Sequence, residues 1–269
     1  MPDQFIYSPG GEQHYHEEQC TVELRCSGDD EAREPHPESP FATGLYVTLA
    51  GKKFLVTNWH VAAGRFPESD KQCGAFEPRV LFARETILNF GKHTAHRLPL
   101  YKNDEPQWIE AKSRIIVEGQ EQRIDLAIIP IAHLTTDAIG INLDDPAKTT
   151  YVPRPLDQIC IIGFPFLRED PIWKTGHIAE RIRPECEYFL VNARTKRGMS
   201  GSGVFSTNVR THDNRSGASN NLLLGIYSGR YADTEQSSLR KATEKELNEL
   251  DLGIVWKTPL IRLILEKAI

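Results

Sequence analysis

The stretch Arg197-Gly198-Met199-Ser200-Gly201-Ser202-Gly203-Val204-Phe205 decides how this 269-residue chain is interpreted. Glycines on both sides of Ser200 allow a positive φ and a close approach of the backbone. A serine held on such a turn presents its hydroxyl beside the amides of Gly198 and Ser200 itself. An acyl-transfer site needs this pairing of a hydroxyl nucleophile with N–H donors aimed at the oxyanion. The alternative interpretation is an ordinary glycine- and serine-rich surface turn.

Two segments upstream supply the partners that a serine nucleophile needs. His60 lies where a strand is expected to run into one helical turn capped by Gly64. Asp125 opens an apolar strand over 125–131, where a carboxylate is costly to bury without a partner. Taken separately, each residue has an ordinary interpretation: His60 as a structural histidine at a strand end, and Asp125 as a surface residue that caps a strand. With Ser200 they form the order His, Asp, Ser along the chain.

These segments together resemble the chymotrypsin-like (trypsin-fold) serine proteases, and among them the bacterial-type, HtrA-like peptidases. Three motifs carry the resemblance: Thr57-Asn58-Trp59-His60-Val61 is similar to Thr-x-x-His-Val, Asp125-Leu126-Ala127 to Asp-Leu-Ala, and Gly198-Met199-Ser200-Gly201-Ser202 to the nucleophile loop. The resemblance extends over about residues 20–269. Met199 stands where relatives carry Asp or Asn. The resemblance therefore does not extend to activation through a new N-terminus.

The resemblance implies a role for each of these residues. Ser200 is expected to attack the scissile carbonyl, His60 to act as general base, and Asp125 to orient the imidazole. The amides of Gly198 and Ser200 are expected to form the oxyanion hole. No cofactor and no metal is implied.

The resemblance also indicates where a substrate side chain binds. It places the pocket for the residue before the scissile bond between the segment ahead of the nucleophile loop and the strand after it. The expected substrate-binding residues are Arg194, Thr195, Tyr227, Ser228, Gly229 and Arg230. An inward-pointing Arg194 or Arg230 would favour an acidic side chain there. If both arginines face solvent, the pocket suits a small or apolar side chain.

Short alternating strands with few helices predict an all-β architecture. Strands are expected near 20–26, 45–57, 79–82, 86–90, 108–117, 125–131, 157–162, 176–183, 188–193, 204–205, 222–227 and 253–256, with helices over 238–250 and after Pro259. The resemblance implies that these strands form two six-stranded antiparallel β-barrels, followed by a C-terminal helix. The expected divisions are a flexible arm over 1–18, an N-terminal barrel over 19–135, a linker over 136–155 and a C-terminal barrel over 156–269.

Composition excludes several classes of partner. The net charge is −5 and the pI about 6.0, so there is no basic surplus for a nucleic acid. No apolar run approaches the roughly 20 residues of a membrane helix, and the N-terminus has no signal-peptide pattern. Five irregularly spaced cysteines are typical of free thiols in a reducing compartment, so a cytoplasmic location is expected. A metal site from Cys20 and Cys26 with His14 and His16 is the weaker interpretation, because the cysteine spacing does not fit zinc.

The sequence therefore predicts an intracellular serine endopeptidase that acts on a protein or peptide substrate. An activating protein partner and a single dedicated target are part of one version of this prediction. The alternative is a catalytically silent trypsin-fold scaffold that binds peptides.

Overall fold

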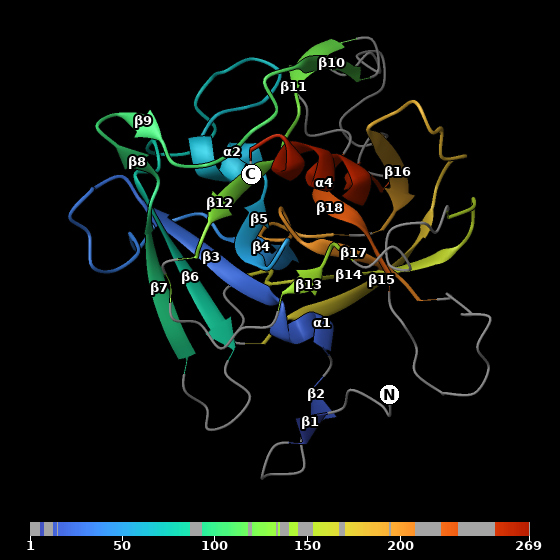
Figure 1. Ribbon diagram of the computed structural model, residues 1–269, viewed down its shortest axis with the longest axis horizontal. Helices are drawn as coiled ribbons and strands as arrows, with labels where there is room; N and C mark the ends of the chain where they lie inside the picture. Colours follow the sequence, from blue (N-terminus) through green and yellow to red (C-terminus); the bar gives the residue numbers. More distant parts are fainter. Residues whose placement is uncertain are drawn as a thin grey trace.

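The computed structural model describes residues 6–7, 13–14, 16–86, 93–117, 120–132, 134, 140–144, 153–166, 170–193, 195–207, 222–230 and 251–268. Strands dominate this part of the chain, as predicted, and three short helices accompany them (Figure 1). The helices are α1 (His16–Gln19), α2 (Trp59–Ala63) and α4 (Thr258–Glu266). The predicted helix over 238–250 lies outside the described residues.

The N-terminal half is built on one twisted sheet with the order β12-β5-β4-β3-β6-β7, and β13 pairs with β4. Its strands are β3 (Thr21–Ser27), β4 (Ala42–Leu49), β5 (Lys52–Thr57), β6 (Val80–Thr86), β7 (His93–Pro99), β12 (Ala127–Pro130) and β13 (Ile141–Asn142). The predicted hairpin over 45–57 is confirmed by the antiparallel β4–β5 ladder. Four shorter strands make two separate hairpins: β8 (Tyr101–Lys102) with β9 (Glu105–Pro106), and β10 (Arg114–Val117) with β11 (Gln120–Arg123).

The prediction of two closed antiparallel barrels needs correction in this half. Within the described residues the N-terminal sheet is open, and β13, inside the predicted linker, pairs with β4 in parallel. The chain that follows β7 returns toward the β12 edge but forms the β8–β9 hairpin on the way. It reaches β12 only through an isolated bridge between Ile109 and Ile128, so no ladder closes the sheet.

The C-terminal half is the predicted closed, six-stranded barrel, with the order β14-β15-β16-β19-β18-β17 and closure by β17 on β14. Its strands are β14 (Gln158–Gly163), β15 (Ile172–Ile178), β16 (Tyr188–Asn192), β17 (Gly203–Ser206), β18 (Leu222–Arg230) and β19 (Leu252–Lys257). The closing helix α4 packs on β18 and β19. Pro259 is in its first turn as expected, but the Thr258 hydroxyl donates to the Leu223 carbonyl instead of capping the helix.

One hydrophobic cluster runs through both halves and holds them together. It joins Leu45 and Val56 of the N-terminal sheet to Ile162 of β14 and Trp256 of β19, all of them buried. Burying each such side chain stabilises the fold by roughly 1.5–3 kcal/mol relative to leaving it exposed. The nucleophile loop therefore rests on a sheet that is packed directly against the histidine-bearing half.

The five cysteines are free thiols. Cys20 and Cys26 are six residues apart, a spacing that would place both side chains on one face of a continuous strand. In the structure Cys20 precedes β3 and packs into the cluster shared by both halves, whereas Cys26 packs into the separate cluster of the N-terminal half. Among the described helices, none combines the length and apolar character needed to cross a bilayer.

Candidate active site

His60 lies at the point where β5 gives way to α2. The helical turn ends as predicted, with Gly64 in the left-handed region at φ 66° and its amide donating to the His60 carbonyl. Asn58, just before the helix, donates its side-chain amide to the Asp125 carbonyl at 2.9 Å. The Asn58 side chain thus holds the backbone at Asp125 close to the backbone that carries His60.

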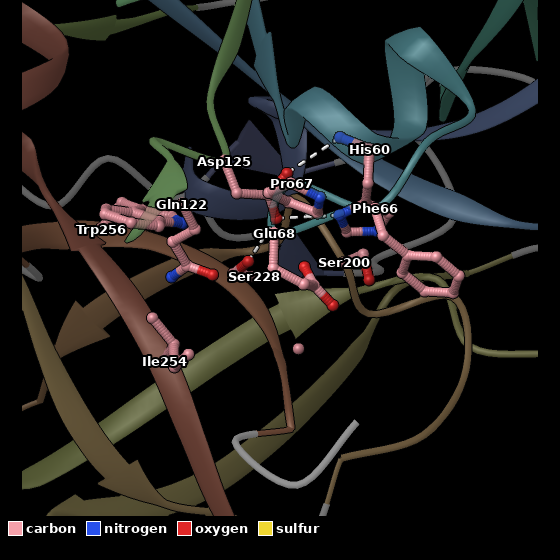
Figure 2. A pocket seen from close by; sticks show the side chains of 11 residues that line it. His60, Phe66, Pro67, Glu68, Gln122, Asp125, Ser200, Ser228, Ile254 and Trp256 are labelled. Carbon is pink, nitrogen blue, oxygen red and sulfur yellow. Dashed lines mark hydrogen bonds and ion pairs between the residues drawn. The ribbon is translucent and has the colours of Figure 1, made fainter. Parts of the chain in front are cut away.

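The Asp125 carboxylate is buried, with 2% of the residue exposed, and accepts three hydrogen bonds. Its Oδ2 lies 2.8 Å from His60 Nδ1, and its Oδ1 accepts from the His60 amide at 2.8 Å. The Ser228 hydroxyl donates to Oδ2 as well (Figure 2). Charge-assisted hydrogen bonds of this kind offset the cost of burying an ionised carboxylate.

The Asp125 carboxylate also sets the protonation of His60. Because an ionised carboxylate only accepts, Nδ1 carries the proton and Nε2 is left as an acceptor. Burial lowers the pKa of His60, but the charge and hydrogen bond of Asp125, together with the charge of Glu68, raise it above the ordinary value of 6.5. Residue 60 is thus a histidine whose basicity is strengthened by two carboxylates.

Ser200 is held by backbone contacts on both sides. Its carbonyl accepts from the Thr43 amide at 2.8 Å, and the next amide, of Gly201, donates to the Tyr227 carbonyl at 2.9 Å. Gly201 has φ +85°, and a Cβ there would overlap the Thr43 carbonyl oxygen. Only glycine fits that position, because it accepts a positive φ and leaves room for the neighbouring backbone.

The amides of Gly198 and Ser200 are the oxyanion donors that the resemblance implies. Within the described part of the chain, neither amide has a hydrogen-bond acceptor. The Gly198 carbonyl is bound by the Thr43 hydroxyl at 2.8 Å, and that hydroxyl accepts from the Phe164 amide at 2.9 Å. Gly198, at φ +97°, is therefore fixed with its carbonyl engaged elsewhere and its amide unpaired.

His60 and Ser200 both line two cavities. The smaller, of about 150 Å³, also contains Asp125, Ser228 and Gly229. Figure 2 shows the His60 ring between the Asp125 carboxylate and the Ser200 side chain. The larger cavity, of about 650 Å³, runs from Ser200 past Gly198 and α2 toward the loop over 37–42. The structure thus brings together the three residues that the sequence singled out.

The smaller cavity includes residues that the sequence analysis missed: Phe66, Pro67, Glu68, Gln122, Ile254 and Trp256. The loop over 66–68 comes shortly after α2, so its nearness to His60 along the chain is the one feature of the sequence that could have predicted its place at the site. Gln122 ends up at the site because β11 leads into Asp125. Ile254 and Trp256 come from β19, and only the strand pairing of the barrel brings them there.

The structure separates the predicted substrate-binding residues into different environments. Ser228 and Gly229 line the smaller cavity. Thr195 and Tyr227 are buried at 2% exposure each, and their hydroxyls lie 2.6 Å apart. Arg194 lies outside the described residues. Arg230 is the last residue of β18, and only its backbone is described.

Comparisons with known proteins agree with this geometry. The family model of the trypsin-like peptidase domain matches residues 42–210, more than half of the chain. The chain therefore belongs to the trypsin-like peptidase family. No curated protein sequence matches it.

Solved structures share the fold at low sequence identity. A serine endoprotease from Yersinia pestis has a TM-score of 0.51 at 14% identity, over 94% of this chain and 63% of that one. The HtrA-type protease AlgW with a tripeptide has a TM-score of 0.50 at 16% identity, over 91% of this chain and 58% of that one. The chain thus spans less than two thirds of the length of either protein.

Proposed function

We propose that the protein is a serine endopeptidase that cleaves peptide bonds through Ser200, His60 and Asp125. Ser200 Oγ forms a bond to the scissile carbonyl carbon while His60 Nε2 takes the hydroxyl proton. The oxyanion is stabilised by the amides of Gly198 and Ser200, each worth roughly 3–4 kcal/mol in the transition state. His60 then gives the proton to the leaving nitrogen, the C–N bond breaks, and the acyl group stays on Ser200.

The second half of the reaction reverses the roles. Water attacks the acyl ester while His60 takes one of its protons, and a new C–O bond forms. The ester bond to Ser200 breaks, and His60 returns the proton to the serine oxygen. Asp125 stays ionised throughout and stabilises the imidazolium through the 2.8 Å contact to Nδ1.

The observation that carries this proposal is the His60–Asp125 pair bordering the same cavity as Ser200. A buried carboxylate that orients a histidine at the same cavity as the partly exposed Ser200 has no evident structural purpose. It is the arrangement that acyl transfer requires, with a base that is itself oriented by a third group.

The end of β18 gives a substrate a place to bind. The ladder between β17 and β18 ends at Gly203 and Ile226, whereas β18 continues to Arg230 alongside β19. One edge of residues 228–230 therefore lacks a β17 partner next to Ser200. An extended peptide would add there as an antiparallel strand and bring its carbonyl to the nucleophile.

The proposal includes a reducing, cytoplasmic compartment, which the five free thiols support. The predicted activating protein partner stays a prediction.

Hydrolysis of an unfolded protein such as casein tests the proposal. We expect new peptide termini with the wild-type chain and none with Ser200→Ala. Ser202→Ala is the matched control, because the buried Ser202 hydroxyl has no hydrogen-bond partner among the described residues. Equal cleavage by wild type and Ser200→Ala would reject the proposed nucleophile, and no cleavage by any variant would favour the silent scaffold.

A further inference from the structure

The Tyr227 side chain fills the recess beside the nucleophile loop. Its ring lies next to Gly253 of β19, where an added Cβ would overlap the ring and would stand 2.9 Å from the phenol oxygen. On the other side its hydroxyl bonds the Thr195 hydroxyl at 2.6 Å, just ahead of the nucleophile loop. The phenol thus spans the space from Thr195 to β19 and leaves it closed to solvent.

A bound peptide would direct one side chain at this recess. Its scissile carbonyl must lie close to Ser200 Oγ with the oxygen at the Gly198 and Ser200 amides. Its backbone would run along the open edge of residues 228–230. The His60 ring occupies one side of the attacked carbon, so the side chain on the acyl side points away from His60. That direction leads between residues 195–199 and the strands β18 and β19, where the Tyr227 ring already lies.

Several contacts hold the ring in place. The Tyr227 backbone is pinned by the bonds from its amide to the Ser202 carbonyl and from the Gly201 amide to its own carbonyl, both 2.9 Å. The Ser228 side chain reaches Asp125, and because consecutive side chains of a strand point to opposite faces, the phenol of Tyr227 points away from Asp125. The ring packs into a buried cluster with Met199, Val191 and Val255. Moving it out would expose apolar surface and leave the buried Thr195 hydroxyl without this partner.

We propose that Tyr227 is the specificity-determining residue of this peptidase: its phenol occupies the space of the acyl-side substrate side chain, so cleavage follows glycine, alanine or serine. This inference rests on the proposed serine peptidase function and names its substrate class. Alanine adds one methyl group at the mouth of the recess, whereas a phenylalanine or aspartate side chain would have to overlap the phenol ring.

Fluorogenic peptides that differ only in the residue before the scissile bond test the inference. We expect wild type to cleave the alanine peptide at least about tenfold better, in kcat/KM, than the phenylalanine or aspartate peptide. Tyr227→Val, which keeps a branched apolar side chain in the core but removes the ring, should raise the phenylalanine-to-alanine ratio about tenfold or more. Tyr227→Phe is the matched control, since it keeps the ring and should keep the preference for alanine.

Labelling with a small alkyl fluorophosphonate, which carries no peptide side chain, distinguishes a failure of the Tyr227 inference from a failure of the proposed peptidase function. If the wild-type protein is labelled but prefers to cleave the phenylalanine or aspartate peptide, the role of Tyr227 is refuted and the peptidase function still holds. Labelled Tyr227→Val with an unchanged profile would lead to the same conclusion. Absence of both labelling and cleavage in wild type would remove the inference and the function together. If Tyr227→Val does not fold, the wild-type profile alone decides.

Discussion

Thr43 and Gly198, 155 residues apart in the chain, are joined by a 2.8 Å hydrogen bond from the Thr43 hydroxyl to the Gly198 carbonyl. The same hydroxyl accepts from the Phe164 amide, and the Thr43 amide donates to the Ser200 carbonyl. One residue of the N-terminal sheet thus binds the nucleophile loop of the C-terminal barrel at two points. The positions of the Gly198 and Ser200 carbonyls are therefore fixed by this contact between halves.

Thr43→Val should therefore weaken both stability and reactivity. The substitution keeps the side-chain shape but leaves the Phe164 amide and the Gly198 carbonyl without their buried partner. We expect a loss of about 1–3 kcal/mol in the free energy of unfolding, measured by urea denaturation, and slower labelling of Ser200 by a fluorophosphonate. Thr43→Ser keeps the hydroxyl and should stay close to wild type. A Thr43→Val protein as stable and reactive as wild type would refute this role.

Gly201→Ala should prevent formation of the nucleophile loop. A methyl group at this position meets the Thr43 carbonyl oxygen, and the backbone φ of +85° disfavours any L side chain. We expect loss of labelling together with a large drop in melting temperature, followed by circular dichroism. Gly51→Ala is the control, because Gly51 also has positive φ (72°) but an open surrounding, and should cost only about 1–2 kcal/mol. Similar melting temperatures for the two variants would contradict the steric argument.

Asp125→Asn should nearly abolish turnover while the chain stays folded. The Asn side chain has only one acceptor oxygen, whereas the Asp125 carboxylate accepts with both oxygens. One of the present donors therefore faces an NH2 group, and the imidazole of His60 is no longer held in its tautomer and orientation. We expect kcat to fall about 10⁴-fold. Asp144→Asn, on an exposed carboxylate that accepts from the Ala50 amide, is the control. A decrease in kcat of less than tenfold for Asp125→Asn would argue against its proposed role.

The pH dependence of kcat/KM should report the raised pKa of His60. The base must be neutral to accept the serine proton, so activity falls as the pH drops through the His60 pKa. Because Asp125 and Glu68 raise that pKa, the midpoint of the acid limb should lie above 6.5. Glu68→Gln removes one negative charge and should move the midpoint downward, more clearly at low salt. Glu77→Gln, in an ion pair with Arg65, is the control. A wild-type midpoint at or below 6.5 would be inconsistent with this electrostatic picture.

The sequence predicted the parts of this molecule whose chemistry is local. The turn at Gly64, the β4–β5 hairpin and the loop around Ser200 follow from glycine positions and short alternating runs. It also predicted the closed C-terminal barrel, through the resemblance carried by those same motifs. Strand β7 was not predicted, because its sequence is mostly polar and shows no regular alternation of apolar and polar residues.

The rest depends on contacts between residues far apart in the chain. Nothing around Thr43 marks it as a partner of Gly198, and only the packing of the two halves creates that bond. The Tyr227 ring lies against Gly253 because β18 pairs with β19, and no spacing in the sequence records that pairing. The open N-terminal sheet likewise depends on where the chain after β7 meets β12.

The role of Ser200 as the nucleophile and of His60 as its base is tested most directly by locating a fluorophosphonate adduct with peptide mass spectrometry. The hydroxyl of an activated serine displaces fluoride from the reagent, so only a serine deprotonated by a neighbouring base reacts rapidly. We expect one adduct, on Ser200, that disappears in Ser200→Ala and forms far more slowly in His60→Ala. Modification of a different serine, or equal labelling after loss of His60, would contradict it.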